Sequence, residues 1–106
     1  MPSKQMSEIY LENLTESSKE EQVYELASMF FSPSEIADYV GLDNNEFISN
    51  IRYSHNDPYA AAYKKGVMNT KIQLRFDTKR YALSGSPEAI NTMRDYMSKQ
   101  KIDESL

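Results

Sequence analysis

The sequence contains no cysteine and a single histidine, His55, among its 106 residues. The absence of cysteine excludes a disulfide scaffold, a cysteine-ligated zinc site and a thiol nucleophile. A single histidine excludes His-rich metal sites and leaves any Ser/His/Asp arrangement dependent on that residue. Glycine-rich phosphate loops and paired-glycine dinucleotide motifs are also missing from a chain with three glycines. The sequence therefore predicts no metal site, no cofactor and no enzymatic activity.

Long apolar runs are missing as well. No run approaches the ~18 residues of a membrane span, and the start, MPSKQMSEIY, lacks the apolar core of a signal peptide. We therefore expect a soluble, cytoplasmic protein without membrane contact. Three glycines, four prolines and a mean hydropathy of −0.68 favour an all-α chain. The length allows one compact domain with or without an arm, and so short a chain is a candidate for oligomerisation.

The net charge of −4 hides a strong asymmetry along the chain. Residues 1–31 carry two bases and six acids, and residues 32–57 carry one base and five acids. Residues 58–84 carry six bases and one acid, whereas residues 85–106 carry three bases and four acids. An acidic first half followed by a basic stretch indicates a polyanion contact, electrostatic packing between subunits, or a solvated helix face.

Helical signals begin after a polar N-terminal arm, residues 1–19, which we expect to fray or to dock on another subunit. Residues 20–31 place Val23, Leu26, Ala27 and Phe30 at i, i+3, i+4 and i+7, the spacing of one helix face.

Two short helices follow, and their boundaries are marked by capping residues. Ser32 and Glu35 form a capping box around Pro33, so a helix begins here. Gly41 supplies the left-handed stop, and Asp43 begins the next helix.

The phrase FSPSEIADYVGLDNNEFISNIR is typical of a helix-turn-helix, with Ala37 where the helices meet and Phe47 and Ile51 facing the core. We expect a head over residues 20–56. If its second helix enters the major groove, its polar side chains contact bases, since Asn pairs with adenine and Arg with guanine. These candidates are Asn44, Asn45, Ser49, Asn50 and Arg52. Asp43 and Glu46 oppose such a contact, because phosphates repel them.

Asp57 and Pro58 begin a long basic helix that reaches about Ser84. Four basic residues of this helix are further candidates for DNA contact: Lys64, Lys65, Lys71 and Arg75. The helix carries two apolar stripes: one suffices to cover the head, and the other implies burial against another subunit. The second stripe, our candidate oligomerisation surface, consists of Met68, Ile72, Phe76 and Leu83. The alternative is a helix that breaks near Gly66 and folds back.

Gly85, Ser86 and Pro87 end the long helix and begin a short closing helix that we expect to reach about Lys101. Residues 57–101 thus form the oligomerisation region, and residues 102–106 a disordered tail.

The run YKKGVMNTKIQLRFDTKRYALSGSPEAINTMRDYM resembles the end of small terminase subunits of tailed bacteriophages and prophages. In that family a helix-turn-helix precedes a long helix, and a small-residue turn, here Ala82 to Gly85, introduces a closing helix. The resemblance covers about residues 20–98. It implies a non-catalytic packaging subunit in the bacterial host cell. Such a subunit forms a homo-oligomeric ring, binds double-stranded viral DNA and presents it to the large subunit, which carries the ATPase and nuclease.

Two other functions fit the same residues. A small dimeric transcriptional regulator needs only two-fold symmetry and half-sites about one helical turn apart. A protein-binding adaptor would use the helix-turn-helix as a scaffold, and the acidic first half favours it.

Overall fold

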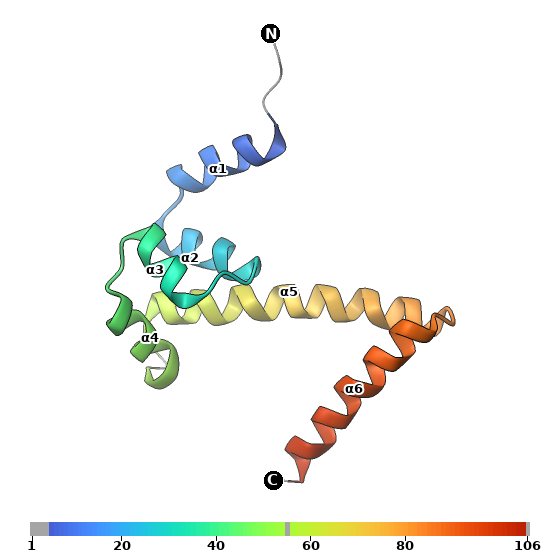
Figure 1. Cartoon of the computed structure of the whole chain (residues 1–106). Helices are drawn as coiled ribbons and strands as arrows, with labels where there is room; N and C mark the ends of the chain where they lie inside the picture. Colours follow the sequence, from blue (N-terminus) through green and yellow to red (C-terminus); the bar gives the residue numbers. More distant parts are fainter. Residues whose placement is uncertain (1–4, 55, 106) are drawn as a thin grey trace. The chain divides into compact units, whose positions relative to one another are not determined.

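The computed structural model describes residues 5–54 and 56–105 and confirms an all-α fold over them. The helices are α1 (Met6–Glu16), α2 (Lys19–Ser28), α3 (Pro33–Val40), α4 (Asn44–Tyr53), α5 (Pro58–Leu83) and α6 (Pro87–Glu104) (Figure 1). The chain divides into two compact units. The head unit comprises the described residues up to Thr70, and the hairpin unit comprises those from Lys71 onward, so α5 contributes to both.

The predicted helix boundaries in the middle of the chain are confirmed. The Ser32 hydroxyl accepts a hydrogen bond from the Glu35 amide, and the Ser32 amide donates to the Glu35 carboxylate at 3.0 Å. This capping lowers the pKa of the Glu35 carboxyl. Gly41 ends α3 in the left-handed region with φ of 86°. The Asp57 carboxylate accepts from the Ala60 amide at 2.8 Å at the start of α5.

Of the two alternatives predicted for the N-terminal arm, fraying is wrong for the residues that the structure describes there, and docking on another subunit stays a prediction. α1 forms a regular helix, and its Leu14 is buried in the core of the head. The Tyr10 hydroxyl donates a hydrogen bond of 2.7 Å to the Glu25 carboxylate, which joins α1 to α2. Leu14 and Tyr10 thus lie on the face of α1 that contacts the rest of the head. The sequence pattern indicates this face only weakly.

The expected helix over 20–31 ends early, at Ser28. Val23, Leu26 and Ala27 are buried as predicted, but Phe30 has a φ of +64° and is 51% exposed. Phe30 therefore does not continue the apolar face. The Phe31 amide donates to the Leu26 carbonyl at 3.3 Å and closes the end of the helix.

α1, α2, α3 and α4 contribute the buried residues of the head core, and the first half of α5 packs against it. Its buried members are Leu14, Val23, Leu26, Ala27, Ile36, Ala37, Val40 and Phe47. Tyr63 and Val67 of α5 cover this cluster. α5 is continuous through Gly66, so the alternative of a break and a fold-back at that glycine is wrong.

The hairpin unit consists of the second half of α5, a turn at Gly85 with φ of 98°, and α6. α6 continues to Glu104, so the predictions of an end near Lys101 and of a disordered tail over 102–106 are wrong for residues 102–104. Leu106 lies outside the described residues. No residue from Lys71 to Ser105 is buried, which means that this unit has no hydrophobic core of its own.

Candidate nucleic-acid interface

α4 corresponds to the second helix of the predicted helix-turn-helix, and it is fixed by the cap at its first turn and by one aromatic contact. The Asp43 carboxylate accepts from the Glu46 amide at 2.8 Å. The Leu42 amide donates to the Ala37 carbonyl at 2.9 Å, which folds the turn back on α3. Phe47 is buried and meets the Tyr63 ring edge-on, with centroids 6.0 Å apart. α4 is thus anchored through one face and presents its other face outward.

Three of the predicted base-contacting residues share that outward face. At about 100° per residue, Asn45, Ser49 and Arg52 fall within a sector of about 60°, roughly opposite to Phe47 and Ile51. All three are exposed. We call these three residues the α4 outer face. An amide, a hydroxyl and a guanidinium can donate to base edges and phosphates, so the chemistry of this face suits the major groove.

The other two candidates on α4 lie in different surroundings. Asn44 is half-buried, and its side-chain oxygen lies 3.4 Å from the Ser34 hydroxyl of α3, which donates to it. Asn50 is half-buried and lines a small hollow with Asp57 and Tyr59 at the beginning of α5. Neither side chain belongs to the α4 outer face.

Two of the predicted DNA-contact lysines, Lys64 and Lys65, belong to the head unit and are exposed on α5. Lys65 lines a hollow of about 610 Å³ together with three glutamates of α2, Glu20, Glu21 and Glu25. Nearby carboxylates lower the local potential, which weakens the attraction of Lys65 for phosphate. Lys64 does not line this hollow.

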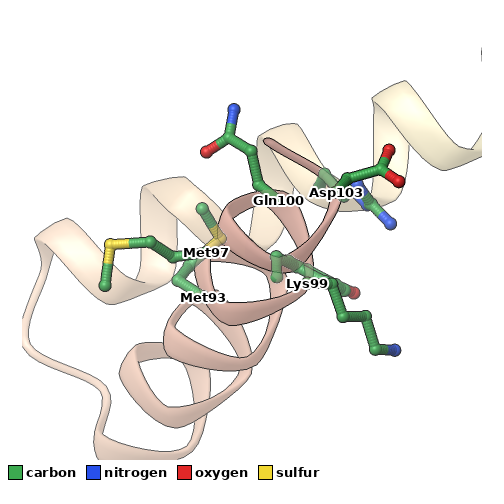
Figure 2. A pocket seen from close by; sticks show the side chains of 7 residues that line it. Met93, Met97, Lys99, Gln100 and Asp103 are labelled. Atoms are coloured by element: carbon green, nitrogen blue, oxygen red, sulfur yellow. The ribbon is translucent and has the colours of Figure 1, made fainter. Parts of the chain in front are cut away.

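Lys71 and Arg75 belong to the hairpin unit and are exposed. The Arg75 guanidinium lies over the Tyr96 ring of α6, 4.1 Å from its centroid, in a cation–π contact. Arg75 also borders a hollow of about 510 Å³ that α6 lines (Figure 2). In that view Met93 and Met97 lie on one side of α6 and Lys99 and Asp103 on the other.

All four residues of the predicted oligomerisation stripe are exposed. Met68 lies in the head unit, whereas Ile72, Phe76 and Leu83 lie in the hairpin unit. Their exposed fractions are 54%, 57%, 66% and 79% in chain order. Large apolar side chains with this exposure and regular spacing are a candidate interaction surface, and their role in oligomerisation stays a prediction.

Sequence reasoning missed a second apolar surface, on the head. Side chains of α1, the end of α2 and α3 line a groove of about 470 Å³. The signal was present in the arm, where Tyr10 and Leu14 stand at i and i+4 with Leu11 beside Tyr10. Because α1 was expected to fray, no surface was assigned to it.

The described residues show no metal-binding cluster of three or more histidine, cysteine, aspartate or glutamate side chains. His55 lies outside the described residues, so its predicted lack of a catalytic role is untested. Over the described part of the chain, no helix combines the length and apolar character that a membrane crossing requires. The chain matches no protein-family model, no curated protein and no solved structure.

Proposed function

We propose that this chain is a non-catalytic DNA-recognition subunit of a phage genome-packaging terminase, acting in the cytoplasm of the bacterial host. In this proposal it self-associates into a ring, binds double-stranded viral DNA and presents it to the terminase large subunit. The observation that carries the DNA-binding part is the α4 outer face, where Asn45, Ser49 and Arg52 are exposed together on the second helix of a helix-turn-helix.

Self-association is supported by the hairpin unit. A helical pair without a buried residue gains little from hydrophobic burial as a monomer, because burial of apolar surface is the main favourable term in folding. Its exposed Ile72, Phe76 and Leu83 would supply that burial against other copies. Several copies would also multiply a weak DNA contact, since linked sites bind more tightly without new contacts.

The experiment is a selection of bound duplexes from a random double-stranded DNA library at low salt, followed by titration of the selected duplex at several salt concentrations. We expect Asn45→Ala and Arg52→Ala each to weaken specific binding by about tenfold or more, the usual cost of a lost base contact. Asn50→Ala is the matched control on the same helix, because Asn50 lies off the α4 outer face. Equal losses in all three variants would argue against base recognition by this face.

Native mass in solution tests the assembly. A closed ring of several copies supports the packaging proposal. A dimer that selects a palindromic site would assign the chain to the transcriptional regulators instead.

A protein-binding adaptor is the second candidate, and the charge of α4 favours it. Asp43 caps α4 and Glu46 lies in its first turn. The only basic residue of α4 is Arg52, in the last turn. Carboxylates at the leading end of a recognition helix are repelled by phosphates. If no salt-sensitive DNA binding is detected at low ionic strength, the adaptor function replaces DNA recognition.

A further inference from the structure

The groove on the head unit is an apolar surface with acidic neighbours. Tyr10 and Leu11 of α1, Met29 and Phe31 at the end of α2, and Tyr39 of α3 line it. Their exposed fractions lie between 39% and 52%, so the monomer leaves much of this surface in water.

One carboxylate lines the groove, and a second is bonded to one of the residues that line it. Glu35 lines it from α3, and Glu25 of α2 accepts the hydrogen bond from Tyr10. The chain up to residue 57 carries three bases and eleven acids in all. An occupant of the groove is therefore favoured if it carries apolar anchors with positive charge beside them.

The hairpin unit carries a surface of that description. At about 100° per residue, Ile72, Phe76 and Leu83 fall within about 40° of one another on α5. Lys79 shares this face, and Arg75 and Arg80 flank it on opposite sides. We call Ile72, Phe76 and Leu83 the hairpin stripe. The residues of α5 from Lys71 to Leu83 include four bases and one acid, Asp77, which pairs with Arg80 at 3.5 Å.

We propose that the hairpin stripe of one copy docks in the head groove of a second copy. A helix that presents apolar anchors along one face fits an apolar groove between helices. The charges on the two surfaces are opposite, whereas a stripe-to-stripe contact would bring Lys79 and its flanking arginines against the same residues of the other copy. This inference rests on the self-association in the proposed function and adds which surfaces meet.

The proposed contact is heterologous, because the two surfaces differ. A docked pair then keeps one free groove and one free stripe, and successive copies close into a ring or continue as a filament. A symmetric stripe-to-stripe contact would instead stop at a dimer.

The test uses one variant for each surface. Leu11→Glu places a charge in the groove, and Phe76→Glu places one in the stripe; both residues are more than half exposed, so the fold should tolerate the change. Asn13→Glu on α1 and Gln73→Glu on α5 are matched controls that add the same charge at exposed positions off the two surfaces. Circular dichroism and thermal unfolding verify that each variant is folded.

Native mass spectrometry then measures each variant alone and in an equimolar mixture. We expect both surface variants to be monomers alone and both controls to assemble like the unmodified chain. In the mixture, the intact stripe of Leu11→Glu meets the intact groove of Phe76→Glu, so a 1:1 heterodimer forms and grows no further. The remaining groove and stripe both carry a glutamate and repel each other.

Three results would overturn the inference, and they are distinguishable. If Leu11→Glu assembles normally while Phe76→Glu is a monomer, the groove is not the docking site, and self-association in the proposed function still holds. If the mixture stays monomeric, the two surfaces do not meet. If the unmodified chain is itself a monomer, both this inference and the ring of the proposed function fail.

Discussion

Gly66 of α5 lies directly against the carbonyl oxygen of Tyr24 in α2. A Cβ atom at residue 66 would collide with that oxygen and would also stand 3.1 Å from the Ala27 Cβ. The close approach lets two hydrogen bonds form between the helices, both at 2.6 Å. The side-chain amide of Asn69 donates to the Tyr24 hydroxyl, and the Thr70 hydroxyl donates to the Ser28 carbonyl. A glycine at the centre of a long helix is therefore a packing residue here.

The substitution Gly66→Ala should destabilise the head by about 2 kcal/mol or more, because overpacking against backbone forces the helices apart. In an open helix the same change stabilises by about 1 kcal/mol. Urea denaturation followed by circular dichroism measures the difference. Ala61→Gly, at an exposed position of α5, is the control and should cost about 1 kcal/mol from helix propensity alone. A stabilised Gly66→Ala variant would contradict the close approach of α2 and α5.

The backbone of Phe30 should be strained. Its φ of +64° costs a residue with a side chain about 1 kcal/mol relative to glycine, and half of the ring is exposed. We therefore expect Phe30→Gly to raise the free energy of unfolding by about 1 kcal/mol. Met29→Gly, where φ is −101°, should lower it. If Phe30→Gly is the less stable protein, contacts of the ring outweigh the backbone strain.

Stability should fall at alkaline pH through Tyr10. Burial, and then the hydrogen bond to Glu25, raise the pKa of the Tyr10 hydroxyl from 10.0 to about 12. Because the folded pKa is the higher one, this contribution is complete below the ordinary pKa and is lost as the pH rises toward 12. Urea denaturation at about pH 9 and about pH 11.5 should show a drop in stability that is smaller in Tyr10→Phe. An equal drop in both proteins would assign the effect to other groups.

The hairpin unit should be the less protected part of the monomer. With no buried residue between Lys71 and Ser105, its amides depend on exposed helical hydrogen bonds. In hydrogen exchange at low protein concentration we expect α6 to exchange faster than α2 and α3, and to become protected as the concentration rises and copies assemble. Phe76→Glu should remove that concentration dependence. Slow exchange of α6 at every concentration would show that the hairpin is stable alone.

Capping and turn signals predicted the middle of the chain well. Ser32, Gly41, Asp43 and Asp57 act within four residues of themselves, so their hydrogen bonds can be anticipated from the local sequence. The burial of Val23 and Phe47 followed from helical spacing for the same reason. The α4 outer face was predicted only in part. Asn44 and Asn50 were predicted together with it, whereas Asn44 accepts a hydrogen bond from Ser34 and Asn50 lies beside Asp57 and Tyr59.

The amino-acid sequence by itself determined the all-α class, the boundaries of α3 and α4 with the turn between them, and the asymmetry of charge. These depend on composition and on contacts between near neighbours. The tertiary structure decided where α1 packs, why Gly66 is a glycine, and that an apolar groove lined by Glu35 exists on the head. Each of these depends on contacts between residues far apart in the chain. Leu14 is buried by partners on other helices, and Gly66 is constrained by Tyr24, more than forty residues earlier.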